Sequence, residues 1–328
     1  MKERLLDLTF RYGAIFVIIA VFIYFSVTQP YFLNFENMMD ILKYISIVTL
    51  VGTGITISLV VDGFDLSVGS TVSLATVVAA SLMVWYEMPL VLVILVPLLL
   101  GALVGLLNAF LIVRIGIPDL LATLAVMYII GGVHRTYTEG YNIHNYMNMP
   151  DGTKAPGAVS DSFLWLGKGE VAGVPVPVIL MLVTIVIVHL FLNYTRWGRQ
   201  MYITGGNQEA ARLSGIRVNR IRYAAYMMSG ALAAMGGVLF AARVGSGQID
   251  AGAPFLMEGV AAVFVGFSVF GAGKPNILGT FLGSLLIGIL LNGLTMQNLP
   301  YYAYDIVKGT VLVMALAVTF VHLKRRKT

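Results

Sequence analysis

Apolar stretches about as long as a lipid bilayer is thick recur along the whole chain, and they decide its fold class. A membrane-spanning helix needs roughly 17 to 25 mostly apolar residues. Of the 328 residues, 58% are hydrophobic and only 11% are charged, whereas soluble domains carry about 25% charged residues. Because a soluble core could not bury this much apolar surface, we expect an all-α polytopic membrane protein.

About ten stretches qualify as transmembrane helices. They cover residues 12–28, 43–61, 68–86, 89–112, 118–136, 176–194, 220–243, 257–271, 276–294 and 303–322. Bulky residues follow the first stretch where a signal peptide would have small ones, so we expect an uncleaved span. Glycine pairs, such as Gly101 with Gly105 and Gly283 with Gly288, predict close helix packing. The whole chain, 1–328, then forms a single transmembrane domain.

The basic residues predict the orientation of these helices, because cytoplasmic loops carry an excess of Lys and Arg. With both termini in the cytoplasm, the inner side holds most of the 21 basic residues. They are Lys2, Arg4, Arg11, Arg114, Arg196, Arg199, Arg212, Arg217, Arg220, Arg222, Lys274, Lys324, Arg325, Arg326 and Lys327. The longest extracytoplasmic loop then covers about 137–175. The net charge of +5 reflects contact with the lipid bilayer, and we expect no nucleic-acid partner.

A short polar segment, "GGNQEAARLSGIRVNR" at 205–220, interrupts the apolar pattern on the cytoplasmic side. Asn207 suits a helix N-cap, Glu209 complements the helix dipole, and Gly215 predicts the end of the helix. A helix of about two turns is marginal in water, so it needs a surface to bind. That surface is either another protein or lipid headgroups, which Arg212 and its basic neighbours Arg217 and Arg220 would contact.

Three stretches carry a family resemblance. They are "GGNQEAARLSGIRVNRIRYAAYMMSGALAAMGGVLFAAR", "GFDLSVGSTVSLA" at 63–75 and "GAGKPNILGTFLGSLLIGILLNGL" at 271–294. In this order they resemble the ribose-type ABC importer permeases, the transmembrane subunits of the high-affinity monosaccharide branch. The resemblance implies that a coupling segment at about 205–219 binds in a cleft of a separate ATPase. The contacting residues would be Asn207, Glu209, Ala210, Ala211, Arg212, Leu213, Ser214 and Gly215.

The resemblance also implies the partners of the chain. An ABC ATPase subunit would bind ATP and Mg, an extracytoplasmic binding protein would deliver the solute, and a second permease copy would complete the pathway as a homodimer or heterodimer. The chain itself is expected to bind no cofactor. The run ending in Lys274 is no phosphate-binding loop, because Pro275 stands where that motif requires Ser or Thr.

Five polar residues are candidates for the translocation pathway or its gate, because polar groups in spans usually face the interior of the bundle. They are Asp65, Ser67, Asn108, Asn292 and Thr295. Asp65 lies either at a gate or ATPase-facing surface, or at the N-cap of the third span. The amides of Asn108 and Asn292 line the pathway or join neighbouring helices. Thr295 either faces the pathway or bonds to its own helix.

No arrangement of residues predicts covalent chemistry. The four His residues are scattered, Cys is absent, and neither a catalytic triad nor a metal site can be argued. We therefore expect no catalytic residue, no metal site and no enzyme. The prediction is a permease subunit in the bacterial cytoplasmic (inner) membrane that imports a monosaccharide or sugar-like solute. The alternative is an ion-coupled secondary transporter, which the lack of an evident mid-span carboxylate disfavours.

Overall fold

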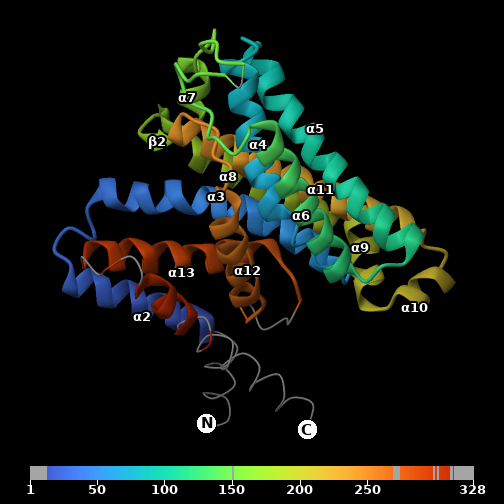
Figure 1. Ribbon diagram of the computed structural model, residues 1–328. Helices are drawn as coiled ribbons and strands as arrows, with labels where there is room; N and C mark the ends of the chain where they lie inside the picture. Colours follow the sequence, from blue (N-terminus) through green and yellow to red (C-terminus); the bar gives the residue numbers. More distant parts are fainter. Residues whose placement is uncertain are drawn as a thin grey trace.

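The computed structural model describes residues 13–149, 151–268, 274–297, 300, 303–310 and 313, and these are mostly helical (Figure 1). The elements are α2 (Gly13–Thr28), α3 (Phe35–Val60), α4 (Val68–Val84), α5 (Leu90–Ala109), η1 (Phe110–Ile115), α6 (Asp119–Tyr137), α7 (Asp161–Lys168), β1 (Glu170–Val171), β2 (Val174–Pro175), α8 (Val176–Tyr194), α9 (Arg196–Gly206), α10 (Gln208–Leu213), α11 (Val218–Val244), α12 (Gly252–Ser268) and α13 (Ile277–Met296). Both predicted cytoplasmic ends, most of the predicted span 303–322 and the end of 257–271 lie outside the described residues.

Six helices among the described residues are long and apolar enough to cross a membrane. They are α3, α5 with η1, α6, α8, α11 and α13, and shorter apolar helices occupy Ile15–Thr28, Val68–Val84 and Gly252–Phe267. The chain is therefore a multi-pass, predominantly α-helical membrane protein, as predicted. The count of about ten spans and the cytoplasmic position of both ends stay predictions.

The burial of the spans differs sharply and divides the molecule into a centre and a periphery. The most apolar window of α3 is 83% buried, whereas those of α5 with η1 and of α6 are 28% and 22% buried. Fully buried Ile45, Leu50 and Ile55 come from α3, while Leu99 of α5 and Tyr128 of α6 are largely exposed. Apolar side chains directed outward fit a lipid solvent, so α3 forms the core and α5 and α6 face outward.

The central helix α11 packs against α3, α4 and α5, and glycines make its contact with α5 unusually close. A Cβ added at Gly101 would collide with the carbonyl oxygen of Gly230, and one added at Gly105 with that of Tyr226. The predicted packing role of these glycines is confirmed. On the other side of the core, α12 packs along α13, and a Cβ at Gly283 would meet the carbonyl of Ala262.

The expected loop at 137–175 contains ordered elements that the sequence analysis did not predict. Helix α7 begins where the Ser160 hydroxyl accepts a hydrogen bond from the Phe163 N–H at 3.3 Å. A two-stranded antiparallel hairpin follows, with Val171 paired to Val174 and Gly173 at φ +78° in its turn. In Figure 1 these elements lie at the end of the molecule opposite α9 and α10.

Candidate functional site

The short helix α10 is built as its sequence predicts. The Asn207 side-chain oxygen accepts a hydrogen bond from the Ala210 N–H at 2.9 Å, which satisfies a backbone donor that the helix leaves free. Glu209 accepts a hydrogen bond from Arg212 at 2.8 Å. Gly215 follows the helix at φ +80°, a left-handed conformation that favours glycine. The predicted N-cap and the predicted end of the helix are both confirmed.

One face of α10 is anchored and the rest is exposed. The Ala211 side chain is buried, and the helix contacts α9 and α11. The other proposed contact residues are exposed; they are Asn207, Glu209, Ala210, Arg212, Leu213, Ser214 and Gly215. Leu213 is 88% exposed, although it is a large apolar side chain. We call α10 with Asn207, Ser214 and Gly215 the predicted coupling surface, and it carries an apolar residue beside an ion pair.

Helix α9, which the sequence analysis missed, supports this surface. The Thr195 hydroxyl accepts a hydrogen bond from the Gly198 N–H at 3.1 Å and so caps the helix. Met201 and Thr204 are buried, and their spacing of three residues is the signal that could have revealed a helix. A Cβ at Gly205 would meet the Val60 carbonyl oxygen. Helix α9, against which α10 packs, is thereby in direct contact with the end of α3.

Beyond the end of α3, the structure brings three of the predicted pathway residues together. Asp65 Oδ1 accepts hydrogen bonds from the Ser67 N–H at 3.0 Å, the Ser67 hydroxyl at 2.7 Å and the Asn108 amide at 3.3 Å. Asp65 Oδ2 accepts one from the Ser229 hydroxyl at 2.8 Å. These four residues, which we call the Asp65 cluster, connect the α3–α4 segment to α5 and α11.

The Asp65 cluster corrects two expectations. Asp65 is fully buried, so it belongs to no surface that an ATPase could contact. Ser67, rather than Asp65, is the N-cap residue of α4. Burial raises the pKa of Asp65, which lies in the connection between two spans, and hydrogen bonds from Ser67 and Ser229 oppose that rise. Ser229 was missed, because nothing in its sequence neighbourhood distinguishes it from other serines in spans.

Asn292 and Thr295 do not join this cluster. The Asn292 amide exchanges hydrogen bonds with Asn37 near the start of α3, whereas Asp65 follows the end of that helix. At about 1.5 Å per residue, most of α3 corresponds to roughly 35 Å. Thr295 bonds to the Leu291 carbonyl at 2.8 Å. Of their two interpretations, helix joining fits Asn292 and bonding within its own helix fits Thr295.

An acidic residue in α12 is a further feature that the sequence analysis missed. Glu258 is 6% exposed, accepts a hydrogen bond from the Tyr44 hydroxyl, and lies 3.8 Å from Lys308 Nζ. Lys308 also pairs with Asp305 at 2.7 Å. Glu258, Asp305 and Lys308 border a cavity of about 640 Å³ between α12, α13 and residues 305–309. The predicted span 257–271 places Glu258 at its very start, so no mid-span carboxylate is evident from the sequence. Helix α12 begins at Gly252 instead and therefore carries this carboxylate in its interior.

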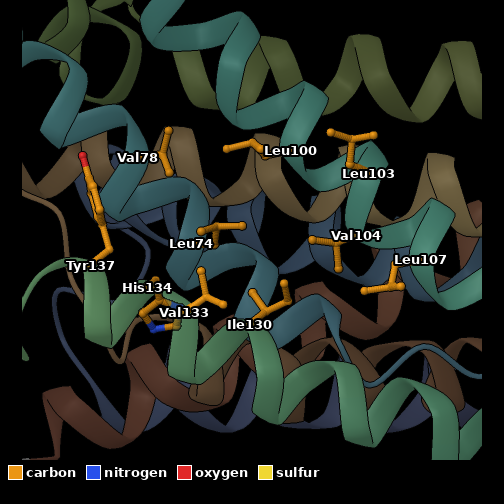
Figure 2. Close-up of a pocket in the computed structure, with 10 residues that line it drawn as sticks. All are labelled: Leu74, Val78, Leu100, Leu103, Val104, Leu107, Ile130, Val133, His134 and Tyr137. Carbon is orange, nitrogen blue, oxygen red and sulfur yellow. The ribbon is translucent and has the colours of Figure 1, made fainter.

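A second cavity, of about 400 Å³, lies between α4, α5 and α6 (Figure 2). Figure 2 shows its lining, in which leucine, valine and isoleucine side chains surround the space and only His134 and Tyr137 carry polar atoms. His134 Nε2 lies 2.9 Å from the Ile249 carbonyl oxygen, and because a carbonyl only accepts, this nitrogen donates. Such a lining offers little to a polyhydroxylated solute. In the described part of the chain, no group of three His, Cys, Asp or Glu residues could hold a metal ion.

Comparison with known proteins identifies the family. The family described as "Branched-chain amino acid transport system / permease component" matches residues 37–316. The chain is 34% identical to the ribose import permease protein RbsC of Escherichia coli (strain K12), over 93% of this chain and 91% of that protein. It is 30% identical to the galactose/methyl galactoside import permease protein MglC of the same strain, over 96% of each chain.

A third relative is the autoinducer 2 import system permease protein LsrD of Salmonella paratyphi A, which is 31% identical over 92% of this chain and 89% of that protein. No solved structure matches the chain significantly. The matched residues 37–316 contain the predicted coupling surface, the Asp65 cluster and Glu258. The chain belongs to the branched-chain amino acid transport system / permease component family, and is a permease of the ABC importer class rather than an enzyme.

Proposed function

We propose that this chain is the membrane-spanning subunit of an ATP-driven importer that carries a monosaccharide or sugar-like small solute into the bacterial cytoplasm. Its relatives import ribose, galactose or methyl galactoside, and autoinducer 2, according to their names. The chain would lie in the inner membrane with about ten spans and both ends in the cytoplasm. Two copies, or this chain and a similar one, would enclose the pathway, and an extracytoplasmic binding protein would deliver the solute.

The observation that carries the coupling part of the proposal is Leu213. A leucine that is 88% exposed on a capped, anchored helix is costly in water and gains free energy when a partner covers it. The adjacent Glu209–Arg212 pair adds charges of both signs that a polar rim can match. We infer that the partner is a separate ATPase subunit, which binds ATP and Mg and contacts residues 207–215.

The contacts beneath α10 suggest how movement would spread. A displacement of α10 would be transmitted to α9 and α11, because α10 contacts both helices. Helix α9 in turn contacts the Val60 backbone through Gly205. The next segment carries Asp65, whose hydrogen bonds hold α5 and α11. Because packed helices move as rigid bodies rather than deforming continuously, closure of the ATPase would tilt these helices together. The Asp65 cluster would keep them joined at the cytoplasmic end, near the inner gate.

Co-purification of an ATPase tests this proposal. The tagged chain and a variant with Glu209→Lys and Leu213→Asp are purified gently from the native membrane, and ATP hydrolysis is measured in both. The matched control carries the same two types of substitution, Glu36→Lys and Leu33→Asp. Both positions are exposed and lie at or just before the start of α3, whereas α9 contacts the end of that helix. We expect ATPase with the intact chain and with the control, and none with the folded α10 variant.

Two results would contradict the proposal. Equal ATPase activity in the α10 variant would mean that the ATPase binds elsewhere on the chain. If no ATPase accompanies even the intact chain in several detergents, ATP coupling fails. Uptake that collapses when the proton or sodium gradient is dissipated would then favour ion-driven transport.

A further inference from the structure

Three arginines converge on one small cavity next to the predicted coupling surface. The cavity has a volume of about 310 Å³ and is lined by Arg196, Trp197, Gln200, Gly215, Arg217, Arg220 and Ile221. Arg196 is the first residue of α9, Arg217 precedes α11, and Arg220 lies in its first turn. Two separate segments thus bring three arginines to the lining of one space, which we call the arginine pocket.

No residue that lines the arginine pocket is acidic. Within the described part of the chain, none of its three arginines forms an ion pair, whereas two neighbouring arginines do. Arg212 pairs with Glu209 at 2.8 Å, and Arg222 pairs with Asp119 at 2.5 Å. Three like charges in one pocket repel each other, so an anion from outside the described chain would relieve this repulsion.

The position of the pocket indicates which anion. Arg196 follows the span α8, which ends at Tyr194, and Arg217 and Arg220 flank the start of the span α11. This is the level at which lipid headgroups meet a spanning helix. Tyr194 and Trp197 are 70% and 49% exposed there, and exposed Tyr and Trp are typical of the membrane interface. Basic pockets between spans on the cytoplasmic side are suited to phospholipid headgroups.

We propose that the arginine pocket binds the phosphate of an anionic phospholipid headgroup, such as phosphatidylglycerol, with the acyl chains lying along α8 and α11. Guanidinium groups form paired hydrogen bonds with phosphate oxygens, and Trp197 covers the glycerol region. The bound lipid would fix the chain entering α9 relative to the start of α11, on either side of α10. The inference rests on the pocket and does not depend on the identity of the transported solute.

Trp197 provides a direct test that needs neither ATPase nor transport. The full chain is placed in vesicles of phosphatidylcholine, and a small fraction of the lipid is replaced by brominated phosphatidylglycerol or brominated phosphatidylcholine, which quench nearby tryptophans. Trp85 and Trp165 lie near the opposite end of the molecule, and a Trp197→Phe variant measures their background. We expect brominated phosphatidylglycerol to quench Trp197 at much lower mole fractions than brominated phosphatidylcholine.

The pocket variant is Arg196→Gln, Arg217→Gln and Arg220→Gln. Its control removes the same charge from cytoplasmic-side positions that do not line the pocket, Arg114→Gln, Arg199→Gln and Lys274→Gln. An arginine near an anionic surface changes lipid affinity by about fivefold, so the pocket variant should lose most of the preference. The control should retain it, because the local pocket rather than net charge selects the lipid.

Three outcomes would overturn the proposal. One is equal quenching by the two brominated lipids. Another is an equal loss of preference in the pocket variant and the control, which would indicate a diffuse charge effect. The third is release of the lipid by inorganic phosphate at matched concentration, which would indicate a general phosphate site. If the two brominated lipids quench Trp197 equally, and this quenching falls when a purified ATPase subunit is added, the anion belongs to a protein partner.

Discussion

Asn37 and Asn292 exchange two hydrogen bonds across 255 positions of sequence. Asn37 donates to the Asn292 side-chain oxygen at 3.0 Å, and Asn292 donates back at 2.7 Å. This reciprocal pair joins the start of α3 to the end of α13. Each of the two amides therefore links one helix to the other. Removing one amide leaves the other without these hydrogen bonds, which lowers the free energy of unfolding.

The first prediction follows from this pair. Asn292→Leu should lower the free energy of unfolding by about 0.5 to 1.5 kcal/mol, because the partly buried Asn37 side-chain oxygen loses its donor, whereas the Asn37 amide nitrogen still donates to the Phe32 carbonyl at 2.8 Å. The double variant Asn37→Leu with Asn292→Leu should recover part of this loss. Thermal unfolding of the four forms in one detergent measures the coupling. Additive losses would show that the two amides do not depend on each other.

The second prediction concerns Asp65. Asp65→Ala should destabilise the chain by about 3 kcal/mol or more, because it leaves the Ser67 N–H and the hydroxyls of Ser67 and Ser229 buried without their acceptor. The Asn108 amide keeps only its bond to the Ser67 hydroxyl oxygen at 2.7 Å. Asp65→Asn should cost less, since its carbonyl oxygen can still accept from Ser67. The yield of monodisperse protein and the unfolding temperature provide the comparison.

Ser284 provides the control for the Asp65 variants. Its buried hydroxyl donates a hydrogen bond to the Thr280 carbonyl of its own helix at 3.0 Å. Ser284→Ala therefore removes a buried polar group without breaking a hydrogen bond between helices. Its unfolding temperature should change little. A cost for Asp65→Ala no larger than that of Ser284→Ala would contradict a joining role for the Asp65 cluster.

The sequence predicts best where local chemistry decides the structure. The cap at Asn207 and the end of α10 at Gly215 depend on neighbouring residues, and both are confirmed. The predicted 176–194 helix coincides with α8 for the same reason, because Pro175 precedes it and a continuous apolar run fills it. The packing role of Gly101 and Gly105 was also predictable, because small residues four positions apart in a spanning helix typically mark a close contact with another helix.

Prediction from sequence fails where polar residues extend an apolar helix, and where contacts between distant segments determine the role of a residue. Helix α3 begins at Phe35 rather than at residue 43, because Glu36 and Asp40 continue the helix although they end the apolar run. Ser229 acquires its role only from Asp65, which is 164 positions away. The arginine pocket joins the start of α9 to the start of α11. No local pattern reveals such pairings without homologous sequences.

The third prediction compares two ion pairs that differ in exposure. Arg222 and Asp119 side chains are 13% and 20% exposed, whereas Arg212 and Glu209 are 52% and 75% exposed. The Arg222–Asp119 pair is partly buried, so breaking it should cost less than the roughly 3 to 5 kcal/mol of a fully buried pair, but more than the roughly 0 to 1 kcal/mol that an exposed pair contributes. Arg222→Ala should therefore lower the unfolding temperature far more than Arg212→Ala. Similar effects of the two variants would show that water reaches the Asp119 carboxylate freely.

The fourth prediction tests the close contact between α5 and α11. Gly105→Ala should destabilise the chain by about 1 to 3 kcal/mol, because the new Cβ would collide with the Tyr226 carbonyl oxygen and force two central helices apart. Gly131→Ala in α6 is the matched control, since a Cβ there meets no atom within 4 Å. Alanine favours a helix over glycine by up to about 1 kcal/mol, so the control should be neutral or slightly stabilising. Unfolding temperatures of the two variants, measured in the same detergent, should therefore move in opposite directions or differ clearly in size. If Gly105→Ala is as stable as Gly131→Ala, the two helices are not held at the distance described here.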